Sequence, residues 1–448
     1  MPGLDSLPLH TDLPHPVGQW GEFISKAQSR EPMFCFLLNG EKALWLNDAE
    51  LMRVTLMAPF AQVGLGPLIK GFEKAGGLGQ ALTVNFGDTW RARRRVLQRP
   101  LTHRGVRQLG PVIQRSLIEQ VDRWQPTEGF AVTEVVTDMI LDVIGATLVS
   151  GDHDEFRQVI HEFDRERNAA FIAISQNPSY EPRANQTFAA SLDALNTFIF
   201  AVIEERRRSP RNDLLSHIVN AATADGESMS NAELRDEVVG LIYAGHKTTA
   251  NSLVFALWLL ATHHEIQDAL AQQTRPLPRD ASLCEVFEEQ APLAADVVAE
   301  ALRMYPVGDL IDRTVAGDFA LAGIDLPAGL PVMFSTWIPQ HDGGAYPDPH
   351  VFRPSRCRPG TMTPAQREAY LPFSTGPKVC LGVHLATFEA AMALAIISQQ
   401  WTVGTPAGAP SDSLPISHDP LLFADPSLQL TLSRRAGSPR TVENREQS

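Results

Sequence analysis

The chain has 448 residues, of which 44% are hydrophobic and 20% are charged, and its formal net charge at neutral pH is −14. This composition suits a soluble globular protein with a large core, and the acidic balance argues against nucleic-acid binding. The four cysteines show no paired spacing, so neither a disulfide framework nor a zinc site is indicated, and a reducing, cytoplasmic setting is expected.

The N-terminal stretch lacks both a basic segment and a long apolar run, so it predicts neither a signal peptide nor a membrane anchor. Residues 1–18 are rich in proline and polar side chains and are expected to form irregular coil. The mostly apolar run from Met33 to Leu46 is interrupted by Asn39 and Gly40, a pair typical of tight hairpin turns. This run therefore predicts a β-hairpin.

Several further elements are predicted in the N-terminal half of the chain. Asp48 is expected to cap a short helix that ends near Leu56. Residues 60–84 are rich in glycine with scattered apolar side chains and predict a surface loop. Residues 110–205 predict several helices, with a loop at the proline-containing stretch 177–182.

Residues 87–95 predict a helix rich in arginine. Trp90 and Arg94 are four residues apart and share one face, where an indole N–H and a guanidinium can together hold a carboxylate. Such a pair is more often an ordinary cation–aromatic contact. The nearby arginines form either a solvated face or a docking surface for an acidic partner; they are Arg91, Arg93, Arg95 and Arg99.

A long apolar pattern without proline predicts a helix over residues 231–262. Its centre contains Gly245, Thr248 and Thr249, which lower helix propensity at that point. A threonine hydroxyl inside a helix can donate to the carbonyl one turn back and open a local bulge. The centre of this helix is therefore expected to be locally irregular.

The next predicted helix places Glu300 and Arg303 on one face, a spacing that is common among exposed ion pairs. Residues 319–334 predict a hairpin around the turn residues 327–329. Residues 358–370 predict a polar meander.

The C-terminal part contains the stretch Phe373-Ser374-Thr375-Gly376-Pro377-Lys378-Val379-Cys380-Leu381-Gly382. Cys380 stands where a loop meets a helix, and the amides and positive dipole end of that helix favour the thiolate. Gly376 and Gly382 let the backbone approach something flat and large, and Phe373 can shield the sulfur. A lone thiolate with apolar walls suits an axial haem ligand; the alternative is a buried, inert cysteine.

The spacing Phe-x-x-Gly-x-x-x-Cys-x-Gly, followed by Leu385, Ala386 and Glu389, resembles the haem-binding loop of cytochrome P450 enzymes. The other landmarks occur in the order typical of that family, and the resemblance covers about residues 20–430. It implies a mainly α fold with a small β-rich region enclosing haem b. The expected organisation is an N-terminal coil (1–18), a single haem-thiolate domain (19–434) and a disordered tail (435–448).

The resemblance implies roles for residues around the haem. Cys380 would be the axial thiolate ligand of the iron, in a loop completed by Phe373, Gly376 and Gly382. The haem propionates would be held by Trp90, Arg94, Arg313 and, with a weaker match, Lys378.

A second set of matched residues would support the core. Glu300, Arg303 and Arg356 would form a buried ionic triad behind the haem, which holds the cysteine loop in place without doing chemistry.

On the open face of the haem, Ala244, Gly245 and Thr248 match the family motif. The glycine would leave room for dioxygen, and the threonine hydroxyl with a water chain would deliver protons. Lys247 stands where the family normally has Asp or Glu. Burial could lower the pKa of Lys247 so that it donates a proton itself, or the side chain could turn to solvent or pair with an acidic group. Lys247 is thus either a bystander or a sign of altered oxygen activation.

The resemblance also outlines a substrate pocket. Residues 60–84 would be the variable loop over it, and residues 110–205 would contain its mobile lid. The wall would include Val307, Leu310 and Ile311 and a turn at 421–423. Asp309 in that wall could meet a polar group of the substrate or be exposed at a turn.

The function implied is insertion of one oxygen atom from O2 into a hydrophobic small molecule, typical of natural-product metabolism. Electrons would come from a ferredoxin or flavodoxin with its NAD(P)H reductase. One alternative is a haem-thiolate enzyme with another outcome, such as desaturation, cyclisation, rearrangement or peroxide-driven chemistry, which Lys247 motivates. Another is a haem-binding sensor without turnover.

Overall fold

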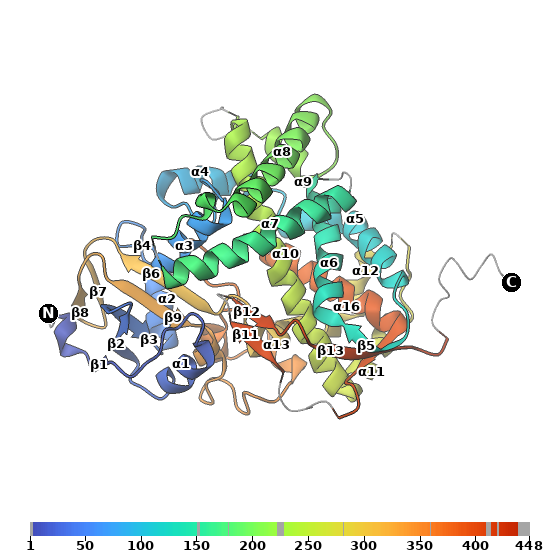
Figure 1. The fold of residues 1–448 in the computed structure, drawn as a ribbon. Helices are drawn as coiled ribbons and strands as arrows, with labels where there is room; N and C mark the ends of the chain where they lie inside the picture. The colour runs from blue at the N-terminus through green and yellow to red at the C-terminus, as the bar shows by residue number, and fades with distance from the viewer. Residues whose placement is uncertain are drawn as a thin grey trace.

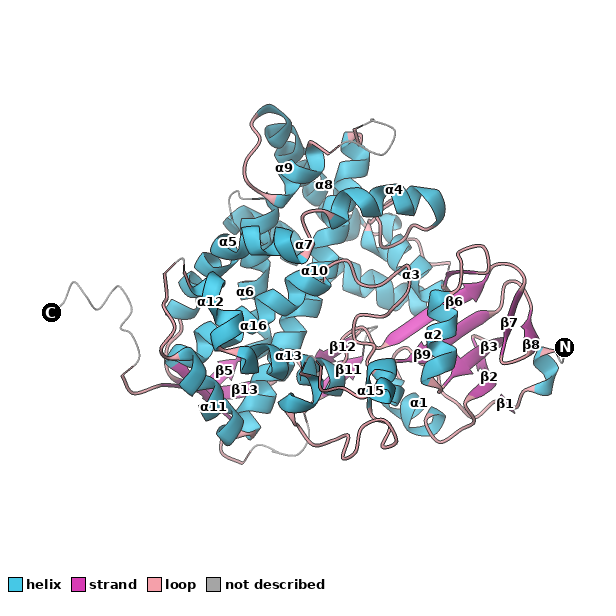
Figure 2. Ribbon diagram, turned by 180° about the vertical axis from the view of Figure 1, so that it is seen from behind, coloured by secondary structure: helices cyan, strands magenta, loops and turns pink. Residues whose placement is uncertain are grey.

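The computed structural model describes residues 3–149, 153–177, 179–221, 228–280, 282–358, 360–408, 414–418 and 421–437. A large helical region occupies one side of the molecule and a smaller β-rich region the other (Figures 1 and 2). The predicted fold class, mainly α with a small β-rich region, is therefore confirmed.

The β-rich region is a six-stranded sheet with the order β1-β2-β3-β9-β6-β4. Its strands are β1 (Leu9–His10), β2 (Met33–Leu38), β3 (Glu41–Leu46), β4 (Val63–Leu65), β6 (Leu310–Val315) and β9 (Pro331–Ser335). Strands β2 and β3 form the predicted hairpin, and both turn residues, Asn39 and Gly40, have positive φ as a primed two-residue turn requires. Next to the sheet lie α1 (Trp20–Ala27) and α2 (Ala49–Met57), the second capped by Asp48 as predicted.

The helical region is organised around the long helix α10, which packs against α6, α8, α13 and α16. Its helices are α3 (Pro67–Gly76), α4 (Gly87–Gln98), α5 (His103–Asp122), α6 (Val132–Ile144), α7 (His153–Gln176), α8 (Gln186–Arg208), α9 (Leu214–Val219), α10 (Asn231–Thr262), α11 (His264–Thr274), α12 (Leu283–Gln290), α13 (Pro292–Met304) and α16 (Val383–Gln400). Two short helices, α14 (Trp337–Gln340) and α15 (Pro364–Ala369), lie between α13 and α16 in the sequence. The continuous helix expected over 231–262 has the predicted bounds.

Three small sheets complete the fold. One joins β10 (Trp401–Gly404), β13 (Gln429–Arg434) and β5 (Thr127–Ala131), and another joins β11 (Ile416–His418) to β12 (Leu422–Ala424). The turn expected at 421–423 is thus largely a strand. The third pairs β7 (Phe319–Leu321) with β8 (Ile324–Leu326).

The hairpin expected over 319–334 is placed differently in the structure. Its two strands meet at Ala322 and Gly323, which both have positive φ. The segment 327–329 is instead a turn that directs the chain into β9, and β9 pairs with β3 and β6. The predicted turn at 327–329 is therefore wrong as the hairpin turn, because pairing of β9 with the distant β3 and β6 places the hairpin earlier in the chain.

Three other segments expected to be irregular contain regular structure. Residues 60–84 include β4 and α3; Pro67 opens α3 and Gly77 ends it in the left-handed conformation, a common pair of helix boundaries. The stretch 1–18 contributes β1, and the meander 358–370 contains α15. The predicted break at 177–182 and tail at 435–448 fall partly outside the described residues, at Pro178 and 438–448 respectively.

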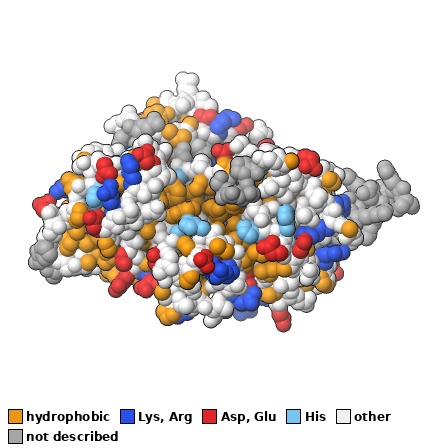
Figure 3. Space-filling view, turned by 90° about the horizontal axis from the view of Figure 1, so that it is seen from below, with side chains coloured by type: hydrophobic (Ala, Val, Ile, Leu, Met, Phe, Trp, Pro, Cys, Tyr) orange, Lys and Arg blue, Asp and Glu red, His pale blue; other side chains and the backbone are white. Residues whose placement is uncertain are grey.

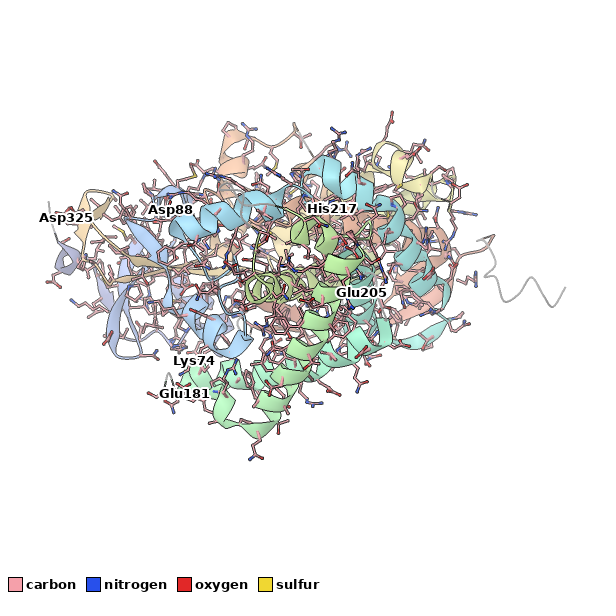
Figure 4. The ribbon with its side chains drawn as sticks, turned by 90° about the horizontal axis from the view of Figure 1, so that it is seen from above. Lys74, Asp88, Glu181, Glu205, His217 and Asp325 are labelled. Atoms are coloured by element: carbon pink, nitrogen blue, oxygen red, sulfur yellow. The ribbon has the colours of Figure 1, made fainter. Side chains whose placement is uncertain are left out.

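Helices α7 and α8 lie over the rest of the helical region, and α3 packs on α7. At the edge of this layer, Lys74 of α3 forms an ion pair with Glu181 at 2.8 Å (Figure 4). Among the described residues, α8 alone is long and apolar enough to cross a membrane by length and composition. It packs on α7, α9 and α10.

Candidate haem site

The cysteine loop is held by its own backbone. The Cys380 amide donates to the carbonyl of Phe373 at 3.0 Å, and the Val379 amide donates to the carbonyl of Gly376 at 3.1 Å. Gly376 has a φ of 75°, and a Cβ there would lie 2.4 Å from the carbonyl oxygen of Leu56. Gly376 is therefore required by the approach of α2, whereas sequence analysis had assigned it to a flat ligand.

Gly382 is the N-cap of α16, and a Cβ there would meet nothing nearer than the Cys380 sulfur at 4.0 Å. The backbone is thus open on that side, as expected for a glycine next to a bound group. Phe373 packs partly buried against the main core. These residues present the sulfur at the start of α16, as predicted.

Cys380 is exposed, whereas the other three cysteines are buried. Burial nevertheless raises the pKa of the Cys380 thiol, and the Gly382 amide and the charge of Arg94 oppose this only in part. A thiol that is accessible and yet surrounded by protein lies at an interior hollow. The Gly382 amide at the helix end favours the thiolate, as predicted, but desolvation of the sulfur outweighs it. Coordination to a metal ion would deprotonate the thiol outright.

Three cations gather beside the loop. The Arg94 guanidinium lies 5.5 Å from the Trp90 ring centroid and donates to the Val379 carbonyl at 2.7 Å. The Lys378 ammonium lies 5.5 Å from the same ring, and Arg313 donates to the backbone of its neighbour Asp312. Burial, followed by the charges of Arg313 and Arg94, lowers the pKa of Lys378 to about 7.

No ion pair links Arg94, Arg313 or Lys378 to a carboxylate in the part of the chain that the structure describes. Cations that repel one another in a partly buried place form a binding site for an anion. Together with the accessible sulfur, this cluster fits an iron porphyrin that carries carboxylate side chains.

The centre of α10 faces open space. Ala244 is exposed although most of this helix is buried, and a Cβ on Gly245 would meet only Ile144, at 3.5 Å. The Thr248 hydroxyl donates to the Ala244 carbonyl at 2.5 Å, one turn back, as predicted. Helix α10 packs on α16, the helix that follows Cys380 in the sequence.

Lys247 pairs with an acidic group, the third of the alternatives that its sequence position left open. Its ammonium forms an ion pair with Asp164 of α7. Asp164 also accepts from Arg167 at 2.7 Å and is almost fully buried. The sequence offered no signal for this partner, because Asp164 lies on a separate helix far away in the chain.

The three residues of the expected ionic triad are in contact and buried. The Glu300 carboxylate forms ion pairs with Arg303 at 2.8 Å and with Arg356 at 3.0 Å. The Cys357 thiol lies 3.2 Å from the same carboxylate, and the Arg303 guanidinium lies 5.0 Å from the centre of the Tyr346 ring. These last two residues were not identified from the sequence.

The arginine-rich helix α4 is less exposed than its sequence suggested. The side chain of Arg93 is 8% exposed and pairs with Glu237 at 2.9 Å, and Arg91 pairs with Asp88 at the start of the helix (Figure 4). Arg95 and Arg99 remain exposed. Any docking surface on α4 therefore has fewer cations than the sequence indicates.

Asp309 is neither exposed nor open to a ligand. It is fully buried, its carboxylate lies 2.6 Å from His418 Nε2, and it accepts from the Ser335 hydroxyl at 3.0 Å. The His418 ring stacks on Trp20 of α1 at 5.0 Å. Both earlier alternatives for Asp309 are therefore wrong, because His418 arrives from β11, which local sequence could not indicate.

Fold and site together define a haem-thiolate protein. Comparison with known proteins gives the same result: the model of the cytochrome P450 family matches residues 2–432. The chain therefore belongs to the cytochrome P450 family, whose members hold haem with a cysteine thiolate as axial ligand, and it is an oxidoreductase of the monooxygenase class.

Two bacterial enzymes are among the similar sequences. Cyclooctat-9-en-7-ol 5-monooxygenase of Streptomyces melanosporofaciens is 26% identical over 422 residues, which cover 88% of either chain. Pentalenene oxygenase of Streptomyces avermitilis is 28% identical over 329 residues, covering 70% of this chain and 71% of that enzyme.

Solved structures share the fold. The retinoic acid-bound cyanobacterial CYP120A1 superposes with a TM-score of 0.83 at 22% identity, covering 97% of this chain and all of that one. The haem domain of cytochrome P450DA superposes with a TM-score of 0.82 at 21% identity, covering 97% of this chain and 98% of that one.

Proposed function

We propose that this monooxygenase, a single catalytic domain over residues 19–434, inserts one oxygen atom into an uncharged, terpenoid-like hydrocarbon skeleton in natural-product metabolism. The observation that carries the proposal is that Asp309 and Lys247, the two charged residues expected around the substrate, are bound to protein partners. Asp309 is bound by His418 and Ser335, and Lys247 by Asp164. Apart from the cation cluster, which the haem propionates would occupy, these residues offer a substrate no free charge. An uncharged ligand suits such a wall, because burying an unpaired charge against it would be costly.

The surface of the molecule and two relatives support this substrate class. On the face seen in Figure 3, hydrophobic side chains gather in the middle. The two Streptomyces relatives carry names of terpenoid oxygenases, at 26% and 28% identity.

The haem group would be held by residues of the cysteine loop and the cation cluster. Cys380 binds the iron through its sulfur, and Phe373, Gly376 and Gly382 shape the loop. Arg94, Arg313 and Lys378 neutralise the propionates, with Trp90 beneath two of these cations. Bound haem with a thiolate ligand supplies reductive activation of dioxygen.

Ala244 and Gly245 would leave room for dioxygen beside the bound haem, and Thr248 would pass protons on. The Thr248 hydroxyl donates its proton to the Ala244 carbonyl, so the lone pairs of its oxygen can accept a hydrogen bond from water. Glu300, Arg303 and Arg356 hold α13 to the segment 354–357 and do no chemistry.

A ferredoxin or flavodoxin with its NAD(P)H reductase supplies the electrons in this proposal. The exposed Arg95 and Arg99 of α4 offer an acidic partner a point of contact. The enzyme works in the cytoplasm.

The substrate proposal is tested by titrating the purified haem protein with a sesquiterpene hydrocarbon and with its carboxylate derivative. The hydrocarbon is expected to shift the Soret band at lower concentration, and turnover under ¹⁸O2 is expected to add one labelled oxygen atom to it. Preference for the carboxylate would contradict an uncharged substrate.

The role of Thr248 is tested by Thr248→Ala. Product formed per NADPH consumed is expected to fall by up to about 10²-fold, the lower end of what a positioned proton-transfer group typically contributes. The red-shifted absorption of the reduced carbon monoxide complex is expected to remain, and its loss in Cys380→Ala serves as the control for the axial ligand. Unchanged coupling in Thr248→Ala would refute its proton-transfer role.

The lysine at position 247, where the family normally has an acidic residue, favours a second candidate function. This is a haem-thiolate enzyme whose reaction has an outcome other than oxygen insertion. Lys247→Glu tests it: we expect a changed ratio of product to NADPH consumed. A product without added oxygen in the wild-type enzyme would favour this candidate, and an unchanged ratio and product in the variant would make Lys247 a bystander.

A further inference from the structure

Helix α7 crosses α10 beside the functional turn of α10 (Figure 1). The Phe163 ring lies edge-on to Tyr243 with centroids 5.8 Å apart, and the Arg167 guanidinium lies 4.4 Å from the same ring centre. Between them on α7, Asp164 forms its ion pair with Lys247, one turn after Tyr243. The crossing thus joins one face of α7 to one face of α10.

Asp164 is a buried anion shared by two cations. Its side chain is 8% exposed, and one oxygen accepts from Arg167 at 2.7 Å while the other faces Lys247. Burial raises the pKa of Asp164, but the charges of Arg167 and Lys247 outweigh it and hold the pKa below its usual range. The carboxylate is therefore ionised and needs both partners.

Lys247 is the residue directly before Thr248. Its backbone carbonyl accepts from Asn251 at 2.9 Å, so its backbone position is fixed within α10. Its neighbour His246 is fully buried, and neither of its ring nitrogens has a partner among the described residues. His246 therefore makes no hydrogen bond to the ammonium, and Asp164 is the group that holds it.

We propose that Asp164 is a positioning residue of the monooxygenase: with Arg167, it holds the Lys247 ammonium against α7, which keeps this cation out of the proton path to Thr248 and fastens α7 to the functional turn. The inference rests on the proposed role of Thr248 but not on the identity of the substrate. An ammonium beside that path would repel the protons that Thr248 must pass on.

A double-mutant cycle tests this. Asp164→Asn frees the ammonium, so product formed per NADPH consumed, measured with a surrogate ferredoxin and its reductase, should fall about three- to thirtyfold. Adding Lys247→Met should recover part of this loss, because the released cation is gone. Amide hydrogen exchange in α7 should be faster in both single variants and the double variant, by a similar factor, because each breaks the same contact.

The controls separate this role from general damage. The reduced carbon monoxide spectrum should show an intact haem-thiolate bond in every variant. Asp164→Glu, which keeps the charge, should restore both coupling and slow exchange. Asp138→Asn removes another contact of α7, the pair with His161 at 3.0 Å, and should leave coupling unchanged.

If Asp164→Asn had the same product per NADPH and the same α7 amide exchange as the wild-type protein, the inference would be overturned. So would a double variant as poorly coupled as Asp164→Asn alone, since Asp164 would then act without Lys247. The exchange measurement needs no turnover. Suppose that Thr248→Ala leaves product per NADPH unchanged, while the effects of the two single variants on α7 amide exchange do not add in the double variant. The proton-transfer role of Thr248 would then be wrong, whereas the role of Asp164 in holding α7 to α10 would stand.

Discussion

Glu389 shows how burial in this core changes the protonation state of a single carboxyl group. It lies on α16, fully enclosed, and its Oε1 has no partner among the described residues. Burial raises the pKa of this carboxyl group to about 8, so it is protonated in the folded protein at neutral pH. Family resemblance pointed to Glu389 but gave no reason for its state, which only the packing around it reveals.

A stability measurement checks this state. The folded protein holds the proton of Glu389 up to about pH 8, whereas the unfolded chain loses it near 4.5. Its stabilising effect is therefore complete below pH 4.5 and is lost as pH rises to 8, by at most about 4–5 kcal/mol. In Glu389→Gln this decline should be absent. Urea unfolding at pH 5 and pH 8 measures it, and parallel behaviour of both proteins would contradict a buried neutral acid.

At the scale of elements, the ionic triad joins α13 to the segment 354–357. Glu300→Gln leaves Arg303 and Arg356 buried without their shared carboxylate, so we expect a loss of about 3–5 kcal/mol in the free energy of unfolding. Lys26→Ala is the matched control: it breaks an exposed pair with Glu22 at 2.9 Å and should cost about 0–0.5 kcal/mol. Equal losses in the two variants would show that burial adds nothing.

The elements that the sequence predicted well are those whose signals are local. The turn at Asn39 and Gly40, the cap at Asp48 and the apolar period of α10 each act within one element. Helix α3 was missed because its glycines resemble those of a loop. The β7–β8 turn was misplaced because strand pairing across the sheet, which no local pattern contains, decides it.

Within the site, motif spacing was enough to identify pairs of residues that are close in the sequence, such as Thr248 with Ala244 and Cys380 with Phe373. The partners supplied by distant elements were not predictable: Asp164 for Lys247, His418 for Asp309 and Cys357 for Glu300. Each pair depends on how two elements approach in space, and one sequence holds no record of that approach.

At the scale of the whole molecule, the cation cluster links haem binding to folding. Burial and the charges of Arg313 and Arg94 lower the pKa of Lys378 to about 7, against 10.5 for an ordinary lysine. Without haem, the folded chain therefore binds one proton fewer than the unfolded chain between these pH values, and its stability should rise with pH there. Haem propionates would offset the lowering.

Removal of the haem tests this. The apoprotein is expected to gain about 2–4 kcal/mol of stability between pH 7 and pH 10, and the haem protein much less. Lys378→Met should abolish the rise in the apoprotein and should weaken haem retention. A pH-independent wild-type apoprotein would show that Lys378 stands apart from the cluster. Chemical denaturation of both forms provides the measurement.

The stacking of Trp20 on His418 has a further consequence. Trp20 lies on the first α-helix and His418 on a strand near the far end of the sequence. The contact can therefore form only after almost the entire polypeptide has left the ribosome. Truncation at either end removes one ring of the stack. The difference in indole emission between the protein, which has seven tryptophans, and its Trp20→Phe variant therefore reports whether both extremities of the chain have met.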